Sequence, residues 1–137
     1  MTLLPTKDNL EMNGDNFLID TNIIIYLTQG KLKISDFAKK GNLYISSITY
    51  IETLGYSFPN HEEEKAIAKL CEIFERVFLT KEIEEQTILI RKSSKIKLPD
   101  AIIAATAIIY NLTLVTRNTD DFKNIQGLKI LNPFTCF

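Results

Sequence analysis

Carboxylates stand in this sequence where predicted strands end and where predicted helices begin. Asp20 follows a short apolar run at 17–19, and Asp100 heads a helix that is apolar on all sides. Glu52 lies in a helix that follows the second predicted strand, on the same stripe as the apolar Ile48. A carboxylate turned toward a core is costly unless it is paired, protonated or bound to a metal ion. These residues are therefore candidates for holding a divalent cation.

A further polar group follows the fourth predicted strand, where Asn118 and Asp121 stand in the run 116–122. Each acidic position also has a purely structural interpretation. Asp20 suits a helix N-cap, Asp100 suits the positive end of a helix dipole, and turns favour Asn and Asp. Glu52 would face solvent if its helix began slightly away from the expected residue. The residues become informative only when they are considered together.

The apolar pattern predicts alternating strands and helices and no tight hairpin. This order indicates βαβ units, a parallel sheet and an α/β fold. The expected strands cover 17–19, 43–45, 77–79, 112–116 and 128–131, and the expected helices cover 23–29, 33–40, 48–57, 59–78, 81–95 and 99–110.

Ligands of an open parallel sheet bind outside the carboxyl ends of its strands, which is where these acids are expected to meet. Carboxylates brought together there repel one another and raise one another's pKa values. A bound Mg²⁺ or Mn²⁺ resolves that conflict, since both ions take a few carboxylates and keep several waters. Such an ion can activate water for attack on phosphorus. The chain has no P-loop, dinucleotide fingerprint or nucleophile elbow, so metal-assisted phosphodiester hydrolysis is the best chemical match.

The composition is that of one folded domain. The chain has 137 residues, of which 45% are hydrophobic and 24% charged. Two distant cysteines and one histidine cannot form a zinc set, and we expect a reduced, cytoplasmic protein. The longest nearly uncharged stretch, 98–116, is interrupted by polar residues and predicts no membrane span. Residues 1–16 are expected to form an N-terminal leader, and 17–137 the domain.

Five segments in order resemble the PIN domain superfamily and, within it, the VapC-type ribonuclease toxins of toxin–antitoxin pairs. The resemblance extends from Phe17 to Phe134, and each segment alone is a weak signal. The segments are Leu18-Ile19-Asp20-Thr21-Asn22, then 45–52 ending in Glu52, then 99–107 with Pro99-Asp100, then 114–122 ending in Asp121-Phe122, and last Asn132-Pro133-Phe134.

The resemblance implies a three-layer α/β/α sandwich with a central, mainly parallel sheet. It also implies that Asp20, Glu52 and Asp100 hold Mg²⁺ (or Mn²⁺), with Asp20 and Asp100 nearest the ion. Asn118 stands where several relatives carry Asp, and Asp121 matches a frequent family residue, so both are expected to complete the site. The implied activity is cleavage of RNA, often tRNA, to a 5′-phosphate and a 3′-hydroxyl. The implied partners are a second copy of the chain and a small antitoxin protein.

The net charge of −1 excludes a general positive field, so RNA would have to be held by local basic groups. One basic cluster, Arg91, Lys92, Lys95 and Lys97, runs into Asp100, and Arg117 lies beside Asn118. We interpret these five residues as candidates for substrate binding, against the alternative of a solvated helix face. A second cluster, at 31–40, is more typical of a solvated surface.

Two other functions stay open on the sequence alone. A PIN-like module with a silent site could bind RNA or a protein partner, and Asn118 and the low positive charge favour that alternative. A phosphoacceptor receiver domain also carries acids at strand ends. It requires an acid pair after the first strand, whereas Asp20 is followed by Thr21 and Asn22.

Overall fold

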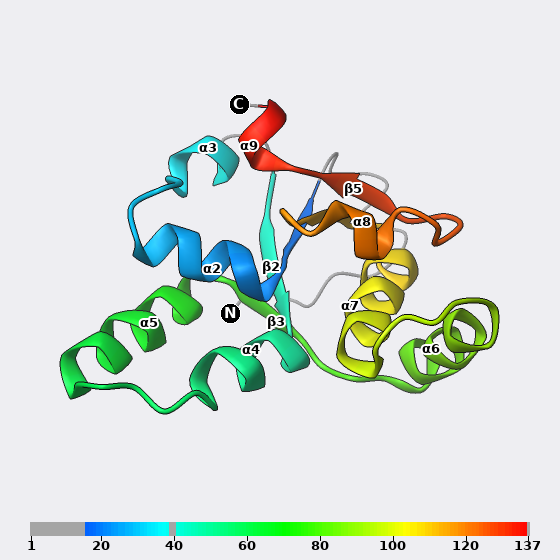
Figure 1. Ribbon diagram of the computed structural model, residues 1–137, viewed down its shortest axis with the longest axis horizontal. Helices are drawn as coiled ribbons and strands as arrows, with labels where there is room; N and C mark the ends of the chain where they lie inside the picture. The colour runs from blue at the N-terminus through cyan, green and yellow to red at the C-terminus, as the bar shows by residue number, and fades with distance from the viewer. Residues whose placement is uncertain (1–15, 39–40, 137) are drawn as a thin grey trace.

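The computed structural model describes residues 16–38 and 41–136, and its centre is a five-stranded sheet. The strands are β1 (Phe17–Ile19), β2 (Leu43–Ser46), β3 (Glu75–Val77), β4 (Thr113–Val115) and β5 (Lys129–Leu131). They lie in the order β3-β2-β1-β4-β5, and every neighbouring pair is parallel (Figure 1). The expected α/β fold with a parallel sheet is confirmed.

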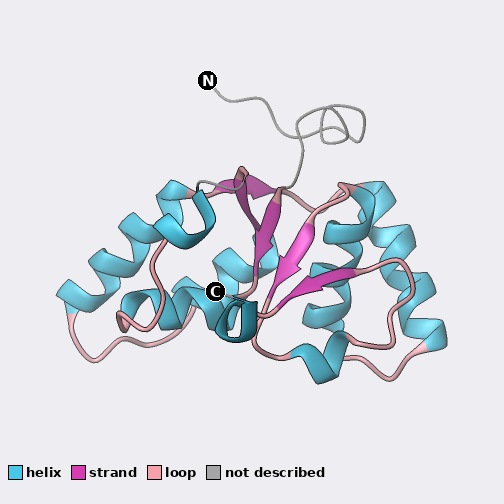
Figure 2. Ribbon diagram, turned by 90° about the horizontal axis from the view of Figure 1, so that it is seen from above, coloured by secondary structure: helices cyan, strands magenta, loops and turns pink. Residues whose placement is uncertain are grey.

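Helices cover both faces of the sheet, which makes three layers (Figures 1 and 2). The first layer holds α2, α3 and α5, and the second holds α6 and α7, while α4 packs against α2, α5 and α7. The described helices are α2 (Thr21–Thr28), α3 (Ser35–Ala38), α4 (Ser47–Leu54), α5 (His61–Ile73), α6 (Lys81–Ser93), α7 (Leu98–Ile109), α8 (Thr119–Phe122) and α9 (Pro133–Cys136). No helix in the described residues is long and apolar enough to cross a membrane.

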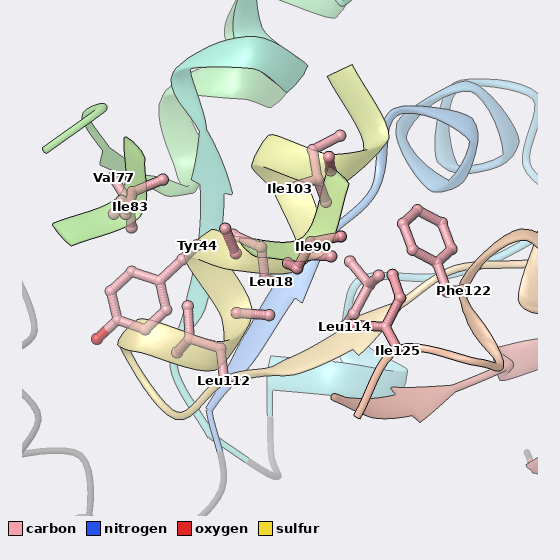
Figure 3. Close-up of a cluster of buried hydrophobic side chains, with 14 residues drawn as sticks. Leu18, Tyr44, Val77, Ile83, Ile90, Ile103, Leu112, Leu114, Phe122 and Ile125 are labelled. Carbon is pink, nitrogen blue, oxygen red and sulfur yellow. The ribbon is translucent and has the colours of Figure 1, made fainter. Parts of the chain in front are cut away.

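Two apolar cores hold the layers together, one on each face of the sheet. On the α6 and α7 face, Leu18 and Leu114 meet Ile90 and Ile103, and Phe122 of α8 closes the cluster (Figure 3). The other core is built by residues of α2, α5 and the opposite faces of β1 and β2, and it includes the buried Cys71. Because the central strands are covered on both faces, they read in the sequence as continuous apolar runs.

The strand order changes direction at the centre of the sheet. The chain passes from β1 to β2 and β3 on one side, and α6 and α7 then return it to β4 on the other side of β1. The carboxyl ends of β1 and β4 therefore mark a topological switch point, the place where open α/β sheets bind ligands. This order also differs from the 2-1-3-4-5 order of receiver domains, so the receiver alternative is excluded.

The connection from α7 to β4 is short and closely defined. Asn111 has a φ of 53°. The N–H of Leu112 donates to Ala107 O at 2.8 Å, and that of Asn111 donates to Ile108 O at 3.3 Å. This is a Schellman ending, which Asn tolerates because it enters the left-handed region more easily than most residues. The ending brings the chain from the buried α7 directly into β4.

Several predicted boundaries were wrong. The helix expected over 59–78 ends at Ile73, and the third strand begins at Glu75 rather than at 77. Phe74 and Val77 continue the helical spacing, but both are buried because β3 pairs with β2. The short helices α8 and α9 were not predicted. Asn16, which was assigned to the leader, is buried and its carbonyl accepts from Thr113 N–H at 2.9 Å, whereas 1–15 lie outside the described residues.

Candidate functional site

Asp20 is the most constrained carboxylate at the switch point. It follows β1, caps α2 and is 5% exposed. Its Oδ1 accepts from Thr21 N–H at 2.8 Å, and its Oδ2 accepts from the Thr116 hydroxyl at 2.7 Å and from Asn22 Nδ2 at 3.2 Å. Burial raises the pKa of Asp20, and these hydrogen bonds oppose that shift. The helix-cap interpretation was therefore correct, but the cap uses only one of the two carboxylate oxygens.

Thr116 links the carboxyl ends of the two central strands. β1 and β4 pair in register from Phe17 with Thr113 to Ile19 with Val115, so the next residue of each strand, Asp20 and Thr116, is also adjacent. The Thr116 hydroxyl is fully buried. It donates to Asp20 and accepts from Asn22 Nδ2 at 3.3 Å and from Asn118 N–H at 3.0 Å. One hydroxyl thus holds a carboxylate, an amide and the start of the next loop.

Glu52 lies at the same site as Asp20, but its side chain is not turned toward the core as predicted. We expected it on a core-facing stripe, but Thr49 and Thr53 are the buried residues of α4 and Glu52 is exposed. The helix begins at Ser47 with Ser46 as its cap, and this start sets which residues turn inward. Glu52 nevertheless faces the site, because its Oε1 accepts from the Thr21 hydroxyl at 2.9 Å. Its carboxylate is thereby connected to the residue that follows Asp20.

Asp100 lies in the first turn of α7, as expected, and is half-buried. Burial raises the pKa of Asp100 to about 6, and the negative charges of Asp20, Glu52 and Asp121 contribute, while Lys97 acts in the opposite direction. No side chain in the described ranges donates a hydrogen bond to Asp100. Three of the acids predicted from the sequence, Asp20, Glu52 and Asp121, thus act on Asp100 at one edge of the sheet.

Asn118 and Asp121 form a pair at the start of the short helix α8. The side-chain amide of Asn118 donates to Asp121 Oδ2. Asp121 is exposed and acts on Asp100 through its charge, whereas the Asn118 side chain contributes no charge of its own. The amide at this position therefore orients an acid rather than adding one.

The donor set fits a hard divalent cation, since it consists of carboxylate, hydroxyl and amide oxygens. Asp100 and Asp20 resist ionisation, so a cation placed between them would relieve an existing repulsion. Among the described residues, no group of three or more Asp, Glu, His or Cys side chains is arranged to hold a metal ion by itself. An open arrangement of this kind matches Mg²⁺, which is usually held by one or two carboxylates and retains waters.

The five candidate substrate-binding residues occupy different positions. Lys95 and Lys97 line an open pocket together with Asp100 and Asp121, so they flank the acids. Arg91 and Lys92 are exposed in the last turn of α6 and do not line that pocket. The structure therefore does not bring these two residues to the acids, because α6 ends at Ser93 and the segment 94–97 separates them from α7.

Arg117 lies on the other side of the acids. Its side chain donates to the Tyr26 hydroxyl at 3.1 Å and lies over the Phe134 ring at 4.4 Å from the ring centre. It lines an open pocket with Asn22, Tyr26 and Asn118. The acids are thus bordered by basic side chains on two sides, one pair on the segment before α7 and one residue after β4.

Sequence reasoning missed the polar residues that hold the carboxylates, namely Thr21, Asn22 and Thr116. The signal that could have identified them is positional. Thr21 and Asn22 follow Asp20 directly, and Thr116 ends the strand that pairs with β1. Thr116 could be identified only from the strand order. It stands far from Asp20 in the chain, and the sequence predicts it only as the last residue of the strand at 112–116.

Comparison with known proteins gives a consistent result. The PIN domain family model matches residues 17–128. Ribonuclease VapC1 of Rickettsia felis is 35% identical over 127 residues, covering 83% of this chain and 93% of that protein. Ribonuclease VapC1 of Methanocaldococcus jannaschii is 31% identical over 132 residues, covering 90% and 93%.

Solved structures agree with this result. A toxin–antitoxin complex from Klebsiella pneumoniae superposes with a TM-score of 0.69 and 32% identity, covering 85% of this chain and 96% of that one. The fold is also that of VapBC2 from Rickettsia felis bound to a promoter DNA fragment, with a TM-score of 0.76, 24% identity and coverage of 85% and 98%. This chain belongs to the PIN domain family and, within it, to the VapC proteins.

Proposed function

We propose that this protein is a metal-dependent endoribonuclease and the toxin of a type II toxin–antitoxin pair. The observation that carries the proposal is the meeting of Asp20, Glu52, Asp100 and Asp121 at the switch point of the sheet, where their charges act on Asp100. Such a group of acids is suited to a divalent cation, and the VapC relatives are named ribonucleases.

We assign Asp20 and Asp100 as the main ligands of Mg²⁺ (or Mn²⁺), with Glu52 as a third carboxylate. When bound, the ion supplies activation of a water and neutralises the charge that develops on the phosphate. Thr116 and Asn22 keep the Asp20 carboxylate oriented, and the Thr21 hydroxyl does the same for Glu52. Asn118 holds Asp121 at the rim of the site, where Asp121 adds negative charge.

The proposed substrate is RNA, and the products would be a 5′-phosphate and a 3′-hydroxyl. Lys95 and Lys97 stand beside Asp100 and provide positive charge for the phosphates next to the cleaved bond. Arg91 and Lys92 can contribute only at longer range, from the exposed end of α6. We also propose a cytoplasmic location, because the substrate is found there.

An antitoxin is the second partner, and the surface beside Glu52 suits a protein. A groove of about 380 Å³ between α2, α4 and α5 begins at Thr21 and Glu52. Its walls include Ile25, Tyr56 and Phe58, and the side chains of Ile25 and Tyr56 are 47% and 66% exposed. Apolar side chains left open beside a charged site are typical of a surface that a protein partner covers.

We further propose a homodimer. Ile51 of α4, Phe78 after β3 and Leu98 of α7 are among the large apolar residues that are more than half exposed, and α4 contacts both β3 and α7. Light scattering of the purified protein tests this assignment. Replacing Ile51 by Asp should shift the mass toward that of one chain if this surface forms the interface.

The activity is tested with purified protein and a mixed RNA pool. Cleavage is expected with Mg²⁺ or Mn²⁺, should stop with EDTA, and should be absent in the Asp20→Asn and Asp100→Asn variants. Glu85→Gln is the matched control, since Glu85 is an exposed carboxylate on α6 and does not line the pockets that contain Asp100, Glu52 or Arg117. Retained cleavage in both ligand variants would refute the assignment.

A silent binding module is the second candidate. The uncharged Asn118 at a position where acids are expected favours it, as does the net charge of −1. In that case the wild-type protein would bind RNA or a partner protein, and adding either metal would release no fragments. The same assay therefore separates the two functions.

A further inference from the structure

The part of the site around Tyr26 carries an additional feature that the metal centre does not explain. Two cations lie against this one ring. The Arg117 guanidinium carbon is 5.2 Å from the ring centre, and Lys31 Nζ is 5.6 Å from it. Within residues 16–38 and 41–136, neither cation has a carboxylate partner. Two like charges gathered without a counter-charge indicate a place for an anion.

Arg117 is also held in one orientation. Its Nη1 donates to the Tyr26 hydroxyl at 3.1 Å, and its guanidinium lies 4.4 Å from the centre of the Phe134 ring. The Tyr26 and Phe134 rings pack edge to face with their centres 4.9 Å apart. Arg117 has five N–H donors, and Tyr26 is the only acceptor that the described residues offer its side chain. Most of its donors are thus free while its direction is set.

The backbone places this arginine next to the metal-site acids. The Arg117 N–H donates to Asn22 Oδ1 at 3.3 Å, and the Nδ2 of the same Asn22 donates to Asp20. Asn22 and Arg117 line one open pocket. The Arg117 backbone is therefore one side chain away from Asp20, and an anion held by its guanidinium would lie at the pocket that Asn22 also lines.

We infer that Arg117, together with Lys31 against the same Tyr26 ring, binds backbone phosphates of the RNA strand next to the cleaved bond, and that Tyr26 and Phe134 are positioning residues for Arg117. This inference rests on the proposed ribonuclease function and gives it a second phosphate contact, across the acids from Lys95 and Lys97. A guanidinium is suited to this role because its planar fork binds two phosphate oxygens at once. It also assigns a function to α9, which supplies Phe134.

Binding is tested by fluorescence anisotropy with a labelled single-stranded RNA of mixed sequence, in EDTA, over a range of salt concentrations. Replacing Arg117 by Gln should weaken binding about tenfold, the loss expected for a charged hydrogen bond. The negative slope of log K against log salt should become shallower by about 0.7, which corresponds to the loss of one phosphate contact on a single strand. Arg117→Lys should keep the slope and lose only part of the affinity, since the charge stays and the fork is lost.

The other variants separate charge from position. Lys31→Gln should also lower the salt slope, whereas Tyr26→Phe and Phe134→Leu should raise KM two- to fivefold, an order-of-magnitude expectation, with an unchanged slope and kcat. Lys129→Gln is the control, because Lys129 is an exposed lysine at the amino end of β5, whereas Arg117 follows the carboxyl end of β4. Thermal unfolding of every variant shows whether the fold is kept, and Arg117→Lys preserves the test if Arg117→Gln unfolds.

Two results would overturn the inference, and they differ. If the wild-type protein cleaves RNA but Arg117→Gln leaves the salt slope unchanged, Arg117 is a packing residue and only the phosphate contact is refuted. If the wild-type protein and the Lys129→Gln control cleave no RNA with either metal, the ribonuclease function fails and the phosphate contact fails with it.

Discussion

The two central carboxylates of the site have opposite surroundings. Asp20 is buried and accepts hydrogen bonds from a backbone N–H, a hydroxyl and an amide. Asp100 is half-buried and receives no hydrogen bond from any described residue, and three other acids act on it. Burial is the largest cause of the raised pKa of both groups, but hydrogen bonds from its neighbours oppose the shift at Asp20, whereas the charges of three other acids add to it at Asp100.

This difference indicates a division of work between the two sides of the site. The β1 side supplies a fixed ligand whose position does not depend on the metal. The α7 side supplies a ligand whose charge is poorly tolerated until a cation arrives. Metal binding and ionisation of Asp100 should therefore be coupled, because the cation and the proton compete for the same carboxylate.

The largest effect is expected from removing either ligand. Asp20→Asn and Asp100→Asn should each lower cleavage more than about 100-fold, beyond the 10- to 100-fold typical of residues that only orient a ligand. RNA cleavage at saturating Mg²⁺ measures this loss. If Asp100→Asn kept most of its activity, Asp100 would not be a metal ligand. The contrast between Asp20 and Asp100 would then say nothing about metal binding.

The next effect is expected at Thr116. Thr116→Val keeps the shape of the side chain but removes the hydroxyl that donates to Asp20, so we expect a 10- to 100-fold loss in apparent metal affinity or activity. Thr135→Val, in the exposed last turn of α9, is the matched control. Metal titration of cleavage measures both variants. Equal Mg²⁺ dependence in Thr116→Val and the wild type would show that Asp20 needs no orientation.

The pH dependence should report on Asp100. Because its pKa is raised to about 6, Asp100 is largely protonated below that pH, and a proton must leave before the metal binds. Apparent Mg²⁺ affinity should therefore fall as the pH decreases below about 6, by up to tenfold per pH unit. Mg²⁺ titrations between about pH 5 and 8 test this, and a flat profile would contradict the coupling.

The smallest effect is on stability, and its sign should differ between the two acids. Since the folded pKa of Asp100 exceeds the unfolded value of 3.8, the metal-free protein loses stability as the pH rises from about 4 to about 6. At pH 7, Asp100→Asn should raise the free energy of unfolding by about 1 kcal/mol, after allowance for solvent contact. Asp20→Asn should lower it by about 1–3 kcal/mol, because one amide oxygen cannot accept from the donors on both carboxylate oxygens, a loss that outweighs the gain from removing a buried charge.

Urea unfolding in EDTA measures both variants against Glu85→Gln, at an exposed carboxylate of α6. Destabilisation by Asp100→Asn would show that its carboxylate is favourably placed without metal, which would contradict the division of work between the two sides. Adding Mg²⁺ should stabilise the wild type at pH 7 and should stabilise Asp100→Asn much less.

Much of this architecture was predictable from the residues. The runs at 17–19 and 43–45 lie within strands β1 and β2, and the apolar helix after Pro99 is present, since burial on all sides leaves a continuous apolar signal. The end of α5 was not predictable, because Phe74 and Val77 both satisfy helical spacing, although Phe74 caps the helix and Val77 pairs with Ser46 of β2. The predicted orientation of the Glu52 side chain was also wrong, since it depends on the residue at which α4 begins.

The order of residue types along the chain was sufficient to determine an α/β fold with acids at the strand ends, because burial periodicity and strand-end chemistry are local properties. Strand order decided the rest. It put Thr116 beside Asp20, turned Asp100 toward three other acids, and placed Phe134 under Arg117. These contacts join segments that are distant in the chain, and no local pattern encodes them, since they arise only when the sheet is assembled and its two halves meet at β1 and β4.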